Sequence, residues 1–363
     1  MPRQRSKENR GLPARWRYAN NAYYYMVPKG LEHLWDGKQS FRLSDKLHEA
    51  YQIWSERVAK PTEAKTIGDL LDRYVLEVIP KKAPASKASN MNQLKMLKRV
   101  FGAHPLMPFT PQLVYQYVDK RSVKKTDPET GKVTGGVIAA HREIELLSHA
   151  YTKAVQWGYI DRHPFKHEVR LQGETPRDRY VEDWEIVEAL SLDCKRKRGS
   201  VIMIQAYLRL KLLTGMAQGD LLRLQTSHIQ DDGIHNERHK TAKKVGKKTI
   251  YAWTPTLRLA VDLALASRSN KNSTFLFCNR YGASYVNEVT GQSSGWKSMW
   301  QRFMERVLKE TKVTEHFTEH DLRAKVGSDA ESLVHAQALL AHADSRTTKR
   351  IYRRKAEVVK PMK

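Results

Sequence analysis

Two short stretches that interrupt regular structure divide this chain into three segments. The first covers residues 61–66 and begins with Pro61, and the second covers residues 171–179 and contains Pro176 among charged neighbours. A chain of 363 residues is too long for one ordinary hydrophobic core, and domains usually meet at such linkers. We therefore predict three domains, at residues 1–60, 67–170 and 180–363.

The first segment has the pattern of a small sheet. Aromatic, strand-forming runs at residues 16–18 and 23–27 flank Asn20-Asn21, and such a pair favours a hairpin. A third strand is expected at residues 40–43, and a helix from Ser44 to about residue 58. We expect three strands and one helix.

The other two segments are predominantly helical by their apolar spacing. In the second, residues 81–89 and 124–132 are expected to be loops, and the whole is expected to be all-helical, with helices at residues 67–75, 89–101, 110–122 and 136–157. In the third segment, apolar and polar residues alternate over residues 229–253, which predicts two or three antiparallel strands. Its expected helices are residues 183–191, 201–213, 255–267, 298–309, 320–329, 333–342 and 345–352. The predicted fold class is mainly α, multidomain (α+β).

The charge balance indicates the partner. Lys and Arg number 64 against 39 Asp and Glu, a formal charge of +25 with a pI near 9.9. Nucleic acid is the partner that best suits such a chain, although a solvated basic surface or a ribosome-associated protein would have the same composition. The first 17 residues are especially basic, as in arms that bind a phosphate backbone.

Cysteine content and the length of apolar runs bear on the cellular location of the chain. Its two cysteines cannot form a disulfide framework, which fits a reducing cytoplasm. The first 17 residues lack the apolar region of a signal peptide, and no apolar run approaches the length of a membrane span. We expect a cytoplasmic protein.

A cluster of reactive side chains stands near the end of the chain. Tyr352 is the only tyrosine in the last 78 residues, and His320, Arg323 and His342 precede it. A phenol can attack a phosphodiester while cationic donors stabilise the charge on the non-bridging oxygens. Taken singly, each residue also has a structural explanation: a packing tyrosine, a surface ion pair or a structural histidine. His316 and His320 have a zinc-like spacing, but no third ligand stands nearby, so we expect no metal.

These residues resemble the motifs of the tyrosine recombinase (phage integrase) family. His320 to Arg323 resembles its His-x-x-Arg box, Leu340-Ala341-His342 its Leu-Gly-His box, and Lys240 its β-hairpin lysine. The first arginine box, normally Thr-Gly-x-Arg, is here Thr214-Gly215-Met216-Ala217, followed by Asp220. Residues 1–60 resemble the arm-binding module of lambda-type integrases, so the resemblance spans the chain.

The resemblance implies roles for these residues. Tyr352 would form a 3′-phosphotyrosyl bond, Arg323 would hold the phosphate, and Lys240 would protonate the 5′-oxygen leaving group. His320 and His342 would donate hydrogen bonds and transfer protons, and Asp220 would support a neighbouring donor. The reaction would need no cofactor. A homotetramer would act on double-stranded DNA carrying core and arm sites, with DNA-bending accessory proteins.

The expected DNA contacts are basic residues of all three segments. Most of them should position the protein on the backbone rather than identify sequence. They are Arg3, Arg5, Lys7, Arg10, Lys87, Lys95, Lys98, Arg99, Lys243 and Lys244.

One departure bears on activity. Ala217 occupies the position of the first catalytic arginine of the family, and its methyl group cannot donate to a phosphate. Losing one preorganised donor typically costs on the order of 10²–10³ in rate. A deliberate substitution that traps a DNA complex and a naturally inactive relative are both compatible with the sequence. The alternatives to a recombinase are a non-catalytic DNA-binding relative and a type IB topoisomerase.

Overall fold

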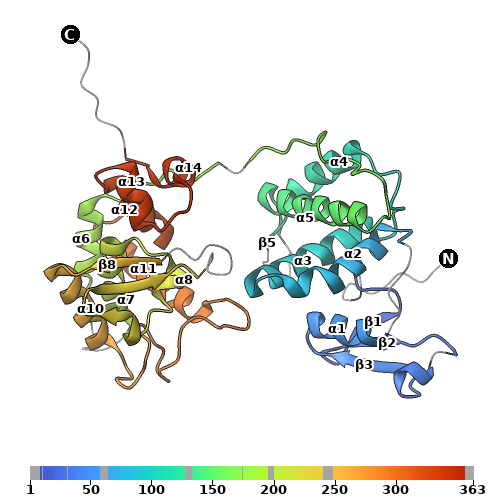
Figure 1. The fold of residues 1–363 in the computed structure, drawn as a ribbon, viewed down its shortest axis with the longest axis horizontal. Helices are drawn as coiled ribbons and strands as arrows, with labels where there is room; N and C mark the ends of the chain where they lie inside the picture. Colours follow the sequence, from blue (N-terminus) through green and yellow to red (C-terminus); the bar gives the residue numbers. More distant parts are fainter. Residues whose placement is uncertain are drawn as a thin grey trace, which may run out of the picture. The chain divides into compact units, whose positions relative to one another are not determined.

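The chain folds into two compact units, which the computed structural model describes over residues 9, 11–30, 32–57, 64–126, 133–173, 175–194, 200–239 and 248–355. The first unit is Met1–Glu174 and the second Thr175–Lys363 (Figure 1). The unit boundary falls inside the predicted linker at residues 171–179, while the boundary at residues 61–66 stays a prediction.

The first unit begins with an antiparallel sheet in the order β1 (Trp16–Ala19), β2 (Ala22–Met26), β3 (Ser40–Ser44), followed by α1 (Leu47–Arg57). Between β1 and β2, Asn20 and Asn21 have φ values of 47° and 54°. Left-handed values at both central positions define the hairpin turn that matches strand twist. The predicted three strands and helix are confirmed.

The rest of the first unit is helical, with α2 (Ile67–Glu77), α3 (Pro84–Phe101), α4 (Pro111–Ser122) and α5 (Val137–Gln156). Two expectations were wrong here. Residues 84–89 belong to α3 rather than to a loop, because proline fits the first turn of a helix, where its missing N–H is not needed. A short ribbon of β4 (Lys125–Thr126) and β5 (Val133–Thr134) also interrupts the segment that was expected to be all-helical.

One hydrophobic core runs from the sheet into the helices of the first unit, from Leu12 and Trp16 to Phe165. At the contact between α1 and α2, the Tyr51 hydroxyl donates to Asp72 (3.2 Å), and Lys98 of α3 ion-pairs with the same carboxylate. Lys98 also donates to the Tyr51 hydroxyl (2.9 Å). A compensated buried pair therefore joins the sheet segment to the helices.

The second unit surrounds α7 (Ser200–Thr214), a helix with a largely buried surface that packs against α10 (Pro255–Ser267), α11 (Ser294–Glu310) and α12 (Glu319–Asp329). Strands β6 (Ile229–Gln230), β7 (Gly233–Glu237) and β8 (Lys248–Ala252) form one antiparallel sheet in that order. The remaining helical segments are α6 (Asp183–Ser191), α8 (Gln218–Leu221), α13 (Leu333–Leu339), α14 (Ser345–Thr347) and the five-residue π-helical η5 (Thr348–Tyr352). In Figure 1 the red C-terminal elements α12, α13 and α14 lie together at one end of this unit.

The predicted fold class is confirmed: helices predominate and the sheets are small and antiparallel. Within the described ranges, no helix has both the length and the apolar character needed to cross a membrane.

Candidate active site

Helix α12 carries two of the predicted site residues on one side. Thr318 and Asp321 form a capping box: the Thr318 side chain accepts from the Asp321 N–H, and the Asp321 carboxylate accepts from the Thr318 N–H. This cap fixes where the helix begins. His320 and Arg323 then stand three residues apart, a spacing that places side chains on neighbouring positions of one face.

The Tyr352 hydroxyl lies in this cluster. It is 3.0 Å from Nε2 of His320, and the Tyr352 ring lies 4.8 Å from the His342 ring between centroids. The Arg323 guanidinium lies over the same ring, with its Cζ 5.5 Å from the centroid. Only 8% of Tyr352 is exposed. Three residues that the sequence singled out therefore converge on the phenol of Tyr352.

The segment that carries Tyr352 is seated on α12. The Ser328 hydroxyl donates to the Tyr352 carbonyl (2.9 Å) and accepts from the Arg354 N–H (2.7 Å). A Cβ added to Gly327 would lie 3.0 Å from Tyr352 Cβ and from its carbonyl oxygen, so a side chain there would push the tyrosine away. Glycine at position 327 thus permits the close approach of Tyr352.

Arg323 is held by backbone carbonyls from both flanking motifs. One of its N–H groups donates to the Gly215 carbonyl, while Nη2 donates to the Leu340 carbonyl (2.5 Å) and lies 3.1 Å from Nε2 of His342. Burial is the main reason that the pKa of this guanidinium is lowered from its usual value. The arginine therefore links the loop before α8 with the turn after α13.

Arginine contacts define the protonation of both histidines. A guanidinium only donates, so the ring nitrogen that faces it must accept. Nδ1 of His320 faces Arg354 (3.3 Å), which leaves the proton on Nε2, toward Tyr352. Nε2 of His342 faces Arg323, so its Nδ1 donates to the Thr348 hydroxyl (2.8 Å). In this arrangement His320 donates to the phenolic oxygen and cannot take its proton at Nε2.

Arg354 connects His320 to a buried carboxylate. Its Nη1 donates to Asp321 (2.6 Å) and to the Arg179 carbonyl (2.8 Å), and only 4% of its side chain is exposed. Burial lowers the pKa of His320, and the charge of Arg354 lowers it further, while Asp321 opposes the shift. The neutral imidazole is thereby favoured near neutral pH.

The loop between α7 and α8 brings Ala217 to the site. Gly215 has φ +63°, and a Cβ there would lie 2.9 Å from side-chain atoms of Leu340 and Val326. Ala217 is the residue that precedes α8, and its neighbour Gln218 donates to Glu319 (2.5 Å), next to His320. Residues on both sides of position 217 therefore contact α12.

A buried lysine lies beneath this loop. Nζ of Lys211 donates to the Met216 carbonyl (2.6 Å), and 1% of the residue is exposed. Burial lowers its pKa to about 7, which Glu319 opposes and Arg323 reinforces. Lys211 thus places a titratable group at the Met216 carbonyl, one residue before Ala217.

Asp220 holds the end of β7. Its Oδ1 accepts from the His239 N–H (3.0 Å), across the gap from α8 to the strand. The expected lysines of this hairpin, Lys240, Lys243 and Lys244, lie outside the described residues. The expected support by Asp220 stays a proposal; its side chain accepts from the backbone two residues after Glu237.

Four of the predicted DNA-contact residues of the first unit lie on α3. Lys95 and Arg99 are exposed there and Lys87 is partly exposed. Lys98 is a correction: its side chain is 6% exposed and its ammonium is ion-paired with Asp72, so it packs inside the unit instead of facing a phosphate. Arg3, Arg5, Lys7 and Arg10 lie outside the described residues.

Sequence reasoning missed three cations of the site. The sequence did not identify Arg354, Lys211 or Arg238 as residues of the site. Only the position of Arg354 two residues after Tyr352 could have indicated it. Arg238 donates through Nη1 to the Ala341 carbonyl (3.0 Å), next to His342.

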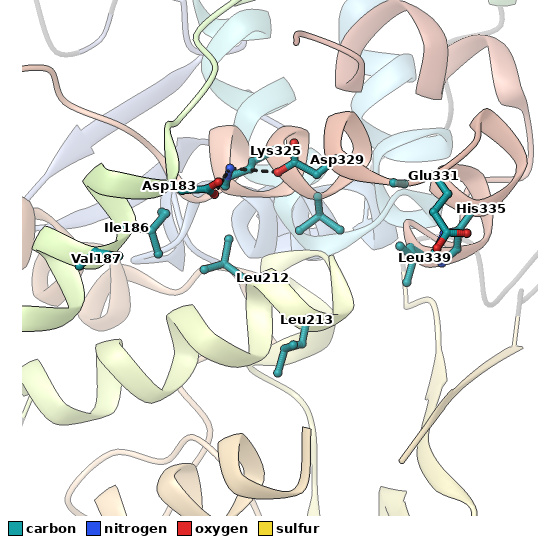
Figure 2. A pocket seen from close by; sticks show the side chains of 12 residues that line it. Asp183, Ile186, Val187, Leu212, Leu213, Lys325, Asp329, Glu331, His335 and Leu339 are labelled. Carbon is teal, nitrogen blue, oxygen red and sulfur yellow. Dashed lines mark ion pairs between the residues drawn. The ribbon is translucent and has the colours of Figure 1, made fainter. Parts of the chain in front are cut away.

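A second hollow of the same unit lies among α6, α7, α12 and α13 (Figure 2). Lys325 lines it and ion-pairs with Asp183 (2.7 Å) and Asp329 (2.9 Å), which line it too. Lys325 stands two residues from Arg323, a separation that puts side chains on different sides of a helix. Tyr352 does not line this hollow, which is therefore distinct from the site above.

Comparison with known proteins places these residues in context. Residues 184–358 match the phage integrase family. The integrase of Enterobacteria phage 434 is 24% identical over 261 residues, which cover 69% of this chain and 68% of that protein. The integrase of Escherichia phage lambda has the same identity and coverage.

Solved structures of lambda integrase are similar to this chain in fold. A lambda integrase dimer bound to a COC′ core site matches 99% of both chains with a TM-score of 0.59 at 19% identity. A lambda integrase tetramer bound to a Holliday junction covers 92% of this chain and 97% of its own, with a TM-score of 0.56 at 20% identity. The chain shares their fold.

Proposed function

Because residues 184–358 match the phage integrase family, we propose that this chain is a site-specific DNA recombinase, the integrase of a phage or other mobile element. In this proposal Tyr352 is the nucleophile. The observation that carries it is the position of the Tyr352 hydroxyl, 3.0 Å from Nε2 of His320 and beside Arg323 and His342. A phenol among cationic and neutral donors suits attack on a phosphodiester.

Cleavage is one displacement at phosphorus. The Tyr352 oxygen bonds to the scissile phosphorus as the bond from phosphorus to the 5′-oxygen breaks. The products are a 3′-phosphotyrosyl linkage and a 5′-hydroxyl. Since this linkage keeps the energy of the broken bond, rejoining needs no ATP or other cofactor.

Each side chain has a stated part in that step. Arg323 donates to the non-bridging oxygens, whose negative charge grows in the transition state. His320 donates to the phenolic oxygen and stabilises it as its proton leaves for the phosphate or water, because Nε2 already carries a proton. His342 orients Arg323, and Lys240 protonates the departing 5′-oxygen.

The DNA is bound by both units. The charge of +25 favours a polyanion, and Lys87, Lys95 and Arg99 of α3 supply phosphate contacts in the helical segment. The N-terminal sheet segment binds separate arm sites, with Arg3 and Arg5 in a minor groove. A tetramer exchanges the strands, as the lambda integrase tetramer on a Holliday junction suggests for this chain, and DNA-bending accessory proteins assist it.

Ala217 reduces cleavage in this proposal. The site lacks the guanidinium that the family has at this position, and a missing donor costs on the order of 10²–10³ in rate. The same residue favours a second candidate, a non-catalytic DNA-binding relative that occupies attachment sites. That candidate has the same fold and DNA affinity but forms no covalent intermediate.

A suicide substrate tests the proposal. The DNA is a duplex carrying the core site located by footprinting, nicked so that the cleaved end diffuses away and the covalent adduct accumulates. We expect an adduct with the natural sequence and none with Tyr352→Phe, while DNA binding is retained.

The controls separate the candidates. Tyr285→Phe removes a hydroxyl elsewhere in the same unit and should leave the adduct unchanged. Absence of an adduct in both the natural chain and Ala217→Arg would exclude the recombinase and favour the non-catalytic relative. Relaxation of a supercoiled plasmid that lacks any attachment site would favour a type IB topoisomerase.

A further inference from the structure

Two arginines bind adjacent carbonyls at the end of α13. Arg323 donates to the Leu340 carbonyl (2.5 Å) and Arg238 to the Ala341 carbonyl (3.0 Å). The preceding carbonyl, of Leu339, accepts from the Tyr251 hydroxyl (2.9 Å). Two guanidinium groups from different elements therefore meet at the turn that leads into His342.

Strand register directs Arg238 toward this turn. Side chains alternate between the faces of a strand. On β7, Ile234 and Asn236 are buried, whereas Glu237 is exposed. Arg238, the residue after β7, is next in this alternation and is partly buried, and the His239 N–H next to it donates to Asp220 (3.0 Å). The backbone that carries Arg238 is thus fixed on both sides, by the pairing of Glu237 with Lys248 and by Asp220.

The two guanidinium groups act on one another electrostatically. The charge of Arg238 lowers the pKa of Arg323, in addition to the larger effect of burial. Like charges brought together in a partly buried site raise its free energy, and a bound anion offsets that cost.

We propose that Arg238 is a second phosphate-binding arginine, a catalytic residue that acts with Arg323 on the scissile phosphate in place of the guanidinium absent at position 217. This inference rests on the proposed function, and it explains how a site with Ala217 retains two guanidinium donors. A guanidinium has several N–H donors, so the contact of Arg238 Nη1 with a carbonyl is compatible with donation to a phosphate.

A structural role for Arg238 makes a different prediction. As a cap for the carbonyls after α13, it would stabilise the turn without regard to charge on the DNA. Removing it would then weaken folding and would affect every DNA alike. A phosphate contact instead makes the effect of Arg238 depend on the charge of one phosphate.

Phosphate ethylation separates the two roles without requiring cleavage. The probe is the footprinted core-site duplex, with phosphates ethylated one at a time so that each in turn loses its charge. The parent protein carries Tyr352→Phe, and Arg238→Met is added to it. Arg258→Met is the matched control, because Arg258 is exposed in the same unit and stacks on Trp253 (4.4 Å).

We expect the parent to lose affinity when the phosphate at the cleavage position is ethylated. Arg238→Met should bind unmodified DNA about tenfold more weakly, in keeping with one lost charged contact, and should lose nothing further when that phosphate is ethylated. Arg258→Met should keep the sensitivity of the parent. If Arg238→Met remains as sensitive as the parent to ethylation of that phosphate, the proposal is overturned.

Cleavage by the chain with Tyr352 intact gives the second readout. Arg238→Met should slow single-turnover cleavage by on the order of 10²–10³, and Arg238→Lys should recover part of it, since lysine keeps the charge but not the planar fork. Equal cleavage by Arg238→Met and the natural chain would also overturn the proposal. If the natural chain forms no adduct while ethylation sensitivity depends on Arg238, the recombinase fails and the phosphate contact stands.

Discussion

Each unit has a cation cluster next to a tyrosine, and the two clusters differ in charge compensation. In the first unit, Lys98 is ion-paired with Asp72 and donates to Tyr51, so the buried cation has a buried anion beside it. In the second, Arg323 and Arg238 bind backbone carbonyls around Tyr352. Carbonyl oxygens satisfy hydrogen bonds but carry no net negative charge, so these contacts do not neutralise the two guanidinium groups.

This difference in charge compensation distinguishes a cluster that holds the fold together from one that serves function. A compensated buried pair costs free energy to break and responds little to ligands. An arginine cluster held by carbonyls is fixed in position before an anion arrives, which is what preorganised stabilisation of a developing charge requires. Removing, titrating or adding charge at the two clusters tests this distinction. Relaxing the turn that supports the second cluster tests it too.

The largest effect is expected in the compensated cluster. Lys98→Met leaves Asp72 buried without its cation, and breaking one partner of a buried ion pair costs about 3–5 kcal/mol. Urea unfolding, followed by circular dichroism, measures the loss. Lys95→Met is the control, because Lys95 is exposed on the same helix and should change stability by less than about 0.5 kcal/mol.

The comparison would fail if Lys98→Met were as stable as Lys95→Met. It would also fail if Lys98→Met weakened binding to the core site without affecting stability. Lys98 would then have to leave Asp72 and reach a phosphate, and the two clusters would be alike.

The second effect is a pH dependence from Lys211. The pKa of this lysine is about 7 in the folded chain and 10.5 when unfolded, so between these values the unfolded chain binds more protons. Stability therefore rises with pH in this window, at about 1.4 kcal/mol per pH unit at most. From pH 7 to pH 9 the natural chain should gain about 2 kcal/mol more than Lys211→Met.

Thermal or urea unfolding at both pH values measures the gain. Lys309→Met, which removes an exposed lysine of α11, should follow the natural chain. Parallel stability curves for Lys211→Met and the natural chain would show that Lys211 is charged throughout. The site would then hold one more positive charge.

The third prediction adds charge where the family has it. If Arg238 already serves the phosphate, Ala217→Arg should raise single-turnover cleavage by only about tenfold, less than the 10²–10³ or so expected for restoring a missing donor. In an Arg238→Met background the same change should restore the larger factor. Equal gains in both backgrounds would mean that the two positions act independently, and Arg238 would not replace the missing arginine.

Much of the fold was predictable from local signals. Helix α10 begins where Thr254 accepts from the Leu257 N–H and Pro255 occupies the first turn, and the sequence predicted its bounds of residues 255–267. The start of α3 was missed because its first residues, rich in Ala, Ser and Lys, lack apolar periodicity. The ribbon of β4 and β5 was missed because two-residue strands carry no periodic pattern.

The site also contains residues that the sequence could identify and residues that it could not. His320 and Arg323 could be identified from the spacing of their motif, and a cap at Thr318 places both on one helix face. Arg238 could not, because its partner Ala341 is 103 positions away in the sequence. Lys98 was misassigned for the same reason: exposed and ion-paired lysines of one helix look alike until Asp72 is placed beside them.

The smallest effect concerns the turn that presents the carbonyls to both arginines. Ala341 has φ +48°, a left-handed conformation that costs a residue with a Cβ about 1 kcal/mol relative to glycine. The family has glycine at this position of its motif. Ala341→Gly should therefore stabilise the chain by up to about 1 kcal/mol, less the extra freedom that glycine gives the unfolded state. Ala343→Gly, two residues on and without a left-handed φ, is the control and should destabilise slightly. If Ala341→Gly destabilises as much as Ala343→Gly, the turn is not left-handed in solution, and the adjacent carbonyls that hold Arg323 and Arg238 together cannot be arranged as described.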